Sequence, residues 1–178
     1  MPSSTAPDEA DDRRAGCVAV TTGRPVAEEA IEDGKLRSDQ RIVVGVDQSA
    51  GGRAALRWAL EEARLRDATV DAVLAWHLPV LGASPAVAVV LDPADEEAYA
   101  QRQLEDLVTG ALADDRGRQV NQIVVHGNAA HALVQVAQGA DLLVVGSRGR
   151  GGFTGLLLGS VSQQCVHHAP CPVVVVRS

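Results

Sequence analysis

The sequence is poor in aromatic residues, cysteine and lysine, and these shortages exclude several classes of protein. Only 2% of its 178 residues are aromatic, which argues against the stacking platforms that bind single-stranded nucleic acid. Its three cysteines are too few for a disulfide-stabilised scaffold. No apolar run reaches the roughly 18 residues that a membrane-spanning helix needs. We therefore expect one globular domain, and thiols that stay reduced agree with a cytoplasmic location.

Charge is distributed unevenly along a chain whose formal net charge is −7. Residues 1–40 contain nine acidic and five basic residues, whereas residues 41–178 contain fourteen and eleven. No Asp or Glu follows Asp141, but three arginines do: Arg148, Arg150 and Arg177. A local basic region on an acidic protein suits a small anionic ligand better than a nucleic-acid polymer. We therefore expect neither a nucleic-acid partner nor a membrane partner.

Residues 1–40 differ in composition from the rest of the chain. Met1–Gly16 combines Pro, Ser, Ala, acids and Arg without apolar periodicity, which is typical of a disordered tail. Cys17–Val20 is a short apolar patch, well below the about 7–15 residues of a secretory signal core. We predict a disordered N-terminal extension over 1–40 and a folded domain over 41–178. For the extension, a passive linker is favoured over a specific regulatory arm.

The folded part alternates short β-branched apolar runs with segments of helical periodicity. Buried strands are predicted at Arg41–Asp47, Thr69–Trp76, Gln119–His126, Asp141–Gly146 and Pro172–Arg177. Helices are predicted from about Arg53 to Arg66, from Asp92 to Leu112, after Asn128 and from Ser160 to His168, with a loop at 77–91. This alternation indicates an α/β fold whose parallel sheet is covered by helices on both faces. Such sheets bind ligands at the carboxyl ends of their strands. The residues to examine there are Asp47, Trp76, Gly127 and the stretch after Gly146.

A glycine-rich stretch, Gly146–Ser160, follows the fourth predicted strand and ends where the last helix starts. Glycine lacks a Cβ, so backbone N–H groups can approach a phosphate closely. The free N–H groups and the dipole of a helix N-terminus favour the same anion. Ser160 could cap that helix or donate its hydroxyl to a phosphate, with help from Ser162. Arg148 and Arg150 add positive charge. Phosphate binding is therefore favoured over a merely flexible surface loop.

Two common phosphate-binding motifs do not fit this stretch. A Walker loop needs Gly-Lys-Ser/Thr, and the single lysine of the chain is Lys35. A dinucleotide fingerprint follows an early strand and has an acid about 20 residues later, whereas no acid follows here. The lack of a late lysine also argues against Asp47 as a phospho-acceptor.

No catalytic or metal-binding set is recognisable. Cys165 and Cys171 fit no usual zinc spacing. His167 and His168 suit the carboxyl end of a helix, where cations are favoured by the dipole. A Gly-x-Ser-x-Gly motif is absent. We therefore predict no catalytic residue and no metal ligand.

Four residues with a defined spacing resemble the universal stress protein family. Gly146, Gly149, Gly159 and Ser160 follow the pattern of glycine, two residues, glycine, nine residues, glycine, and serine or threonine. Other segments that resemble the family are Val43–Ser49, Ala55–Ala59, Val144–Phe153 and Pro170–Arg177. The resemblance covers residues 41–178. At Gly51 and Gly52 the chain departs from many relatives, which have a serine there.

The resemblance implies a three-layer α/β sandwich of the adenine-nucleotide alpha-hydrolase-like type, with five parallel strands in the order 3-2-1-4-5. It also implies a homodimer that binds ATP, accompanied by Mg²⁺. Asp47 would contact the nucleoside, and Trp76 would meet adenine through its backbone. The cofactor-binding residues implied by position are Gly45, Val46, Asp47, Trp76, Gly146, Ser147, Arg148, Gly149, Gly159, Ser160, Val161 and Ser162.

The resemblance favours an ATP-binding regulatory protein of the stress response. Two alternatives stay open. One is a dimeric interaction module with a vestigial pocket, and the other is a slow ATPase or nucleotidyl-transfer enzyme on the same fold. The residues do not distinguish ATP from ADP or a cyclic nucleotide.

Overall fold

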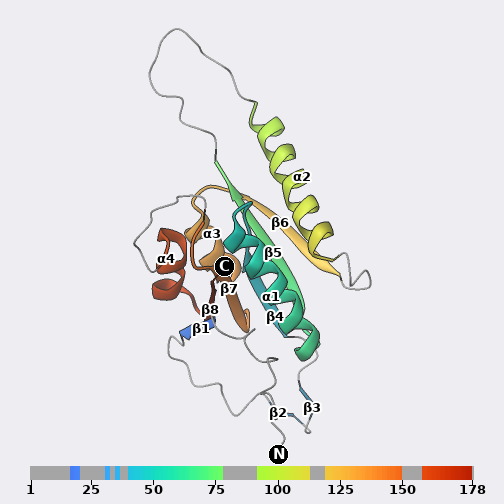
Figure 1. The fold of residues 1–178 in the computed structure, drawn as a ribbon, viewed down its shortest axis with the longest axis vertical. Coiled ribbons are helices and arrows are strands. Elements are labelled where there is room, and N and C mark those ends of the chain that lie inside the picture. The colour runs from blue at the N-terminus through green and yellow to red at the C-terminus, as the bar shows by residue number, and fades with distance from the viewer. Residues whose placement is uncertain are drawn as a thin grey trace, which may run out of the picture.

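The sheet at the centre of the computed structural model is built from strands far apart in the sequence (Figure 1). The structure describes residues 17–20, 31–32, 35–36, 40–77, 92–112, 119–149 and 158–177. The strands of this sheet are β1 (Cys17–Val20), β4 (Arg41–Gly45), β5 (Thr69–Trp76), β6 (Val120–His126), β7 (Leu142–Gly146) and β8 (Val173–Val176). Their order is β1-β8-β7-β4-β5-β6. A separate pair, β2 (Ile31–Glu32) and β3 (Lys35–Leu36), is antiparallel.

The five strands from β4 to β8 are mutually parallel, and their order is 3-2-1-4-5, as predicted. The register places Val43 of β4 opposite Asp71 of β5 and Leu143 of β7. Parallel strands covered on both faces are expected to be apolar throughout. β7 and β8 agree with this rule, because Leu142–Val145 and Val173–Val176 are all buried.

In the part of the chain that the structure describes, four helices cover the two faces of the sheet and complete the three-layer arrangement. They are α1 (Ala50–Arg66), α2 (Pro93–Ala111), α3 (Ala129–Val136) and α4 (Ser160–His168). The core of one face combines residues of α1 and α2 with alternate strand residues such as Val44 and Val174. The core of the other face combines residues of α3 and α4 with strand residues such as Val43 and Val175. Successive strand side chains thus enter opposite cores, as the pleat requires.

The first helix begins three residues earlier than the periodicity predicts, and the reason is its cap. Ser49 has an extended backbone, and its hydroxyl oxygen accepts a hydrogen bond from the N–H of Gly52 at 3.0 Å. This satisfies one of the otherwise unpaired donors of the first turn. The first strand ends at Gly45 rather than Asp47. Of the loop expected at 77–91, only His77 lies within the described residues.

β1 departs from the expectation of a disordered extension at four residues. It pairs antiparallel with β8, from Cys17 opposite Val176 to Val20 opposite Val173. The pairing partner is more than 150 residues away along the chain, so local composition could not predict it. The rest of residues 1–39, apart from β2 and β3, lies outside the described part of the chain.

Hydrogen bonds that Arg41 donates and Asp71 accepts join the amino ends of the strands. The Arg41 guanidinium pairs with Asp71 at 2.7 Å and donates to the carbonyl of Gln138 after α3 at 2.5 Å. The second carboxylate oxygen of Asp71 accepts from the amide of Asn121 on β6 at 2.8 Å. The backbone N–H of Arg41 donates to Asp141 at 2.8 Å. Asp71 is 4% exposed, so these partners replace the water that the buried carboxylate has lost.

Candidate functional site

The candidate site lies where the strand order reverses, at the carboxyl ends of β4 and β7. β4 has β5, the next strand in sequence, on one side and β7 on the other. The connections from β4 and β7 lead to helices on opposite faces of the sheet, α1 and α4. This divergence leaves a crevice at the strand ends in open α/β sheets.

Asp47 follows β4 and holds the turn into α1. One of its carboxylate oxygens, Oδ1, accepts hydrogen bonds from the backbone N–H of Ser49 at 3.0 Å and from the Ser49 hydroxyl. Ser49 in turn caps α1 through Gly52. The orientation of the Asp47 carboxylate is therefore fixed by the turn, and its other oxygen, Oδ2, is directed toward the loop after β7, beside Gly149.

Glycines let two backbone segments meet at this point. A Cβ placed on Gly146 would lie 2.6 Å from the carbonyl carbon of Gly51, and one placed on Gly51 would lie closer still to the carbonyl oxygen of Arg148. These approaches are far below van der Waals contact, so the start of α1 packs directly on the end of β7. A Cβ on Gly149 would lie 3.0 Å from Asp47 Oδ2. The chain thus brings the carboxylate of the first strand beside the second glycine of the predicted phosphate loop.

The two ends of the glycine-rich loop are joined. The N–H of Gly159 donates to the carbonyl of Ser147 at 2.7 Å. The Ser162 hydroxyl reaches the same carbonyl at 3.1 Å and the carbonyl of Gly159 at 2.9 Å. We call this set of contacts among Ser147, Gly159 and Ser162 the loop neck. Residues 150–157 of the predicted loop, which include Arg150, lie outside the described residues.

The amino end of α4 differs from those of the other three described helices. Side chains of Ser49, Asp92 and Asn128 accept hydrogen bonds from first-turn N–H groups of α1, α2 and α3. The capping residue of α4 is Gly159, and no side chain among the described residues accepts from the first turn of this helix. Its leading N–H groups therefore combine with the positive end of the helix dipole and suit an anion. Ser160 is the first helical residue rather than the cap, and it is exposed.

Several predicted site residues make backbone or packing contacts next to Asp47, the glycine-rich loop and the amino end of α4. Gly45 faces α3, because a Cβ there would lie 2.7 Å from a methyl carbon of Leu133. Val46 is 6% exposed, and its N–H donates to the carbonyl of Val73 at 2.9 Å. Val161 packs against the core on the α3 and α4 face. Ser147 and Ser162 are 4% and 2% exposed, so both belong to the interior below the loop.

Trp76 stands at the end of β5 and makes its contacts with β6. Its ring centroid lies 4.6 Å from that of His126, which is its register partner. Its carbonyl accepts a hydrogen bond from the N–H of Gly127 at 2.7 Å. Because that acceptor is already engaged, the expected backbone contact with adenine has to share the carbonyl oxygen or use another atom of the residue.

The sequence marked Gly51 and Gly52 only as a departure from many relatives, which have a serine there. A Cβ on Gly52 would collide with Asp47 Oδ1. Two consecutive glycines in the first turn of a helix are intrinsically unfavourable, and that cost is a signal of close backbone approach. The contact between α1 and the end of β7 thus depends on Gly51 as much as on Gly146, and the turn at Asp47 depends on Gly52.

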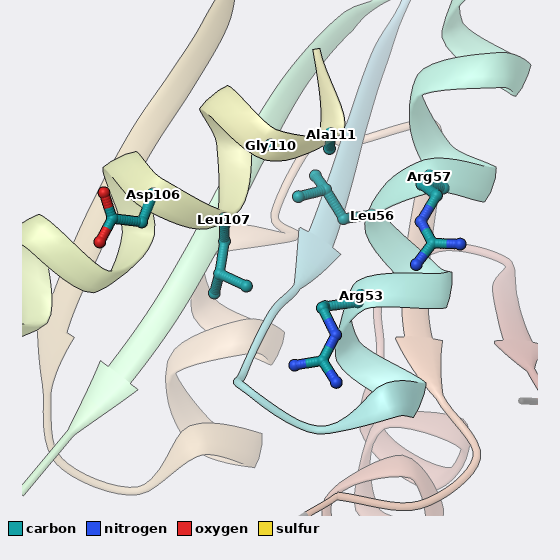
Figure 2. A pocket seen from close by; sticks show the side chains of 7 residues that line it. All are labelled: Arg53, Leu56, Arg57, Asp106, Leu107, Gly110 and Ala111. Carbon is teal, nitrogen blue, oxygen red and sulfur yellow. The ribbon is translucent and has the colours of Figure 1, made fainter. Parts of the chain in front are cut away.

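A pocket of about 210 Å³ lies elsewhere, between α1 and α2. Figure 2 shows Leu56 of α1 and Leu107 of α2 between the two helices, with Arg53 and Arg57 on the α1 side. The other lining residues are Asp106, Gly110 and Ala111. None of the predicted site residues lines this pocket, so it is not the phosphate site.

Two further surveys concern metal sites and membrane spans. Within the described ranges, no three His, Cys, Asp or Glu side chains gather in a group able to hold a metal ion. Among the helices that the structure describes, none combines the length and apolar composition needed to cross a bilayer.

The sequence model of the Universal stress protein family matches residues 40–177. The chain belongs to the universal stress protein family. A family member from Mycolicibacterium smegmatis is 39% identical over 76% of this chain and 47% of its own length. One from Mycobacterium tuberculosis is 37% identical over 93% of this chain and 53% of its own length. The chain thus spans about half the length of these curated relatives.

Solved structures of the family share this fold. The universal stress protein UspA from Lactobacillus plantarum has a TM-score of 0.61 at 22% identity, over 78% of this chain and 97% of that one. A universal stress protein solved in complex with cAMP has a TM-score of 0.55 at 27% identity, over 78% of this chain and 96% of that one. That relative therefore binds an adenine nucleotide.

Proposed function

We propose that this universal stress protein binds ATP and acts as a nucleotide-dependent regulator in the stress response. One observation carries the proposal: Gly149, Asp47 and the amino end of α4, which no side chain caps, stand around a single point at the carboxyl ends of β4 and β7. Backbone N–H groups and a helix dipole favour phosphate, and a carboxylate accepts ribose hydroxyl protons. Both halves of a nucleotide therefore have suitable partners.

The proposed contacts divide into a nucleoside half and a phosphate half. Asp47 Oδ2 accepts from the ribose, and the end of β5 at Trp76 borders the base. The backbone at Gly149 and Ser160 holds the phosphates together with the Ser160 hydroxyl, and the exposed Arg148 adds positive charge. Gly159 positions this segment, because its N–H already donates to the carbonyl of Ser147. Mg²⁺ would bind together with the nucleotide, coordinated by its phosphates. Gly146, Ser147 and Ser162 position the loop, because their contacts are with backbone rather than toward the crevice.

The solved relative with cAMP supports an adenine nucleotide as the ligand class. The choice of ATP within that class rests on the length of the anion-binding surface. The leading N–H groups of α4, the Ser160 hydroxyl and the exposed Arg148 guanidinium offer more donors than a single cyclic phosphate requires. A triphosphate uses them more completely.

Isothermal titration of the purified full chain with Mg-ATP tests this function. Gly149→Ala should weaken binding by roughly 10–100-fold, because a hydrogen bond to a charged group is worth about 1.5–3 kcal/mol. The added methyl would meet Asp47 Oδ2 at 3.0 Å and displace it from the ribose. Gly110→Ala is the matched control, since a Cβ there meets nothing within 4 Å and the site is unaffected.

Other results of the same titration would replace the proposal. Tighter binding of cAMP or ADP than of ATP would identify that nucleotide, and not ATP, as the ligand. Equal affinity in the wild type, Gly149→Ala and Gly110→Ala would disprove the assigned loop. If no adenine nucleotide gives a heat of binding, the protein is instead an interaction module with a vestigial pocket. If ATP is turned over rapidly, the protein is instead an enzyme.

For the organisation of the chain, we propose a domain over 41–178 preceded by an extension over 1–40, acting in the cytoplasm. We also propose that the chain forms a homodimer. Size measurements on the domain alone and on the full chain test this assembly.

A further inference from the structure

The pocket between α1 and α2 has a cationic wall and an apolar floor (Figure 2). Arg53, Leu56 and Arg57 share one face of α1, because residues three and four apart are neighbours on a helix. Leu107 and Ala111 line the pocket from α2. Leu56 is buried in the core beneath these helices, and the two α2 residues pack against the same core. A ligand in this pocket would therefore meet apolar side chains and two guanidinium groups together.

Small side chains of α2 leave this space open. Gly110 and Ala111 lie at the carboxyl end of α2, and both line the pocket. A Cβ placed on Gly110 would meet nothing within 4 Å, so the position has room for a larger side chain. Glycine within a helix is less favourable than every other residue except proline. The chain thus carries a local cost at the point where the pocket of about 210 Å³ stays unfilled.

The two arginines of the pocket have no acidic partner among the described residues, whose ion pairs involve other arginines. Arg53 donates a hydrogen bond to the carbonyl of Gln48, and Arg57 makes no hydrogen bond with any described residue. The acid in the lining is Asp106, which is exposed, and Figure 2 shows its carboxylate directed away from both guanidinium groups. Like charges four residues apart on a helix repel each other. An anion bound between the arginines would remove this repulsion.

The chemistry and the size of the pocket define the class of ligand. Guanidinium groups bind carboxylates through paired, charge-assisted hydrogen bonds, and leucine side chains favour contact with apolar groups. The pocket is smaller than the about 300–1,000 Å³ of most small-molecule sites, so it suits a ligand smaller than a nucleotide. An inorganic anion would use the arginines but not the apolar floor. A carboxylate attached to a compact apolar body uses both.

We propose that the pocket between α1 and α2 binds a small organic carboxylate. Its carboxylate group lies on Arg53 and Arg57, and its apolar body lies against Leu56 and Leu107. This inference goes beyond the nucleotide site and does not depend on it. Because none of the predicted nucleotide-binding residues lines the pocket, the two ligands do not compete for the same groups.

Titration of the isotope-labelled full chain with benzoate, followed by NMR, tests the proposal. Benzoate joins a compact apolar ring to a carboxylate. Benzamide keeps this shape without the charge, and acetate keeps the charge without the ring. We expect saturable shifts of the Gly110 and Ala111 amide signals with benzoate at a dissociation constant of about 1 mM, because a small ligand gains limited free energy. Benzamide and acetate should each bind at least roughly fivefold more weakly.

The signals that shift decide between this pocket and other places on the molecule. Shifts centred on Ser160 and Val161 would place the carboxylate at the amino end of α4 and overturn the proposal. Shifts that grow without saturation, or equal binding of benzoate and benzamide, would also contradict it. A failure of Mg-ATP to bind would disprove the proposed nucleotide function and leave these expectations unchanged.

Arg57→Gln tests the cationic wall of the pocket. It is a cleaner change than one at Arg53, whose guanidinium also supports the turn at Gln48. Loss of the Arg57 guanidinium should weaken benzoate binding by roughly 3–10-fold, since an ionic hydrogen bond is lost at a solvent-exposed wall. Arg64→Gln is the matched control, because it removes an exposed cation of the same helix from outside the pocket lining. Equal benzoate affinity in the two variants would refute the assignment.

Gly110→Leu tests the pocket itself by filling it. The leucine side chain has room at this position and favours a helix more than glycine does, so the variant should fold, as circular dichroism would show. Benzoate binding should fall by roughly tenfold or more, because the apolar floor is covered. Thr109→Leu is the matched control, since it adds the same side chain at an exposed neighbour that does not line the pocket. Wild-type affinity for benzoate in folded Gly110→Leu would overturn the proposal.

Discussion

The two ends of the parallel sheet are built in opposite ways. At the amino end, charged and amide side chains bond across β4, β5 and β6 and fill the space between strands, with Arg41 and Asp71 at the centre. At the carboxyl end, Gly51 and Gly146 bring backbone against backbone with no side chain between, and Gly149 lies beside the Asp47 carboxylate. Arg41 at one end is therefore a structural cation, whereas Arg148 at the other is exposed and available to a ligand.

The difference separates stability from binding. A buried carboxylate with two side-chain partners contributes to folding and leaves no donor or acceptor for a ligand. A glycine-built junction contributes little side-chain burial, yet it brings Gly149 beside Asp47 and close to the amino end of α4, where we propose that phosphate binds. Mutations at the amino end should therefore change the free energy of unfolding, and mutations at the carboxyl end should change affinity.

Asp71→Ala gives the largest expected effect. It leaves the Arg41 guanidinium and the Asn121 amide without their partner, which costs about 3 kcal/mol. The melting temperature should fall by roughly 6–12 °C, while the affinity for Mg-ATP stays unchanged below the transition. Asp106→Ala, an exposed position on α2, is the control and should melt like the wild type. A large loss of affinity in folded Asp71→Ala would refute the separation of the two ends.

The pH dependence of unfolding also tests the comparison. Charged residues at the amino end of the sheet change the pKa of Cys171, one of two buried cysteines. Burial raises the pKa of Cys165 from 9.0 to about 11, with a smaller contribution from Cys171. Burial also raises the pKa of Cys171 from 9.0 to about 11, to which Asp141 adds and from which Arg41 subtracts.

The native state thus keeps these thiol protons where the unfolded chain loses them. The stability that they contribute is complete below pH 9 and is lost as the pH rises to 11. Denaturant titrations from about pH 8 to 11 should show this loss, and Cys165→Ala should reduce it. Asp141→Asn should move the alkylation midpoint of Cys171 to lower pH. A flat stability profile in the wild type would contradict the assignment.

Ser162→Ala tests whether the loop neck supports the site. Loss of its buried hydroxyl, which donates to the neck carbonyls, should cost about 1 kcal/mol of stability. It should also lower ATP affinity by about threefold, since a loosened neck orients the α4 N–H groups less well. The exposed Ser160→Ala is the comparison, and it should lower affinity by roughly 3–10-fold without changing stability. Identical behaviour of the two variants would show that Ser162 is not a positioning residue.

Gly110→Ala gives the smallest expected effect and has the opposite sign. Gly110 lies in α2, and a Cβ there meets nothing within 4 Å. The added methyl restricts the unfolded chain and should stabilise the protein by about 0.5 kcal/mol. Chemical denaturation measures this gain in the free energy of unfolding. Isothermal titration calorimetry of Gly110→Ala should give the same ATP affinity as the wild type. A destabilised variant would mean that the end of α2 is packed more tightly than the structure shows.

Much of the fold could be predicted because its signals are local. The second strand, Thr69–Trp76, and the last helix, Ser160–His168, were predicted with their observed bounds. Periodicity cannot order strands, since it reports which residues are buried and not which strands are neighbours. The order 3-2-1-4-5 came from the resemblance, and the pairing of β1 came from neither.

The candidate site was predictable where the residues share a motif and unpredictable where they meet across the fold. The spacing of Gly146, Gly149 and Gly159 is local, whereas the approach of Gly51 to Gly146 depends on packing between α1 and β7. Asp71 had a faint signal, a lone acid within an apolar strand. Its partner Arg41 lies 30 residues earlier, so the pair emerges only when β4 and β5 align.

The loop neck also has a consequence for engineering. Nine residues separate Gly149 from Gly159, and the bond between Gly159 and Ser147 fixes where that stretch leaves and rejoins the fold. A doubling of loop length costs only about 0.6 kcal/mol when the loop ends are already held together. A circularly permuted fluorescent protein inserted between these glycines would therefore be tolerated by the sheet. With the proposed nucleotide binding, its brightness would report nucleotide levels inside a living cell.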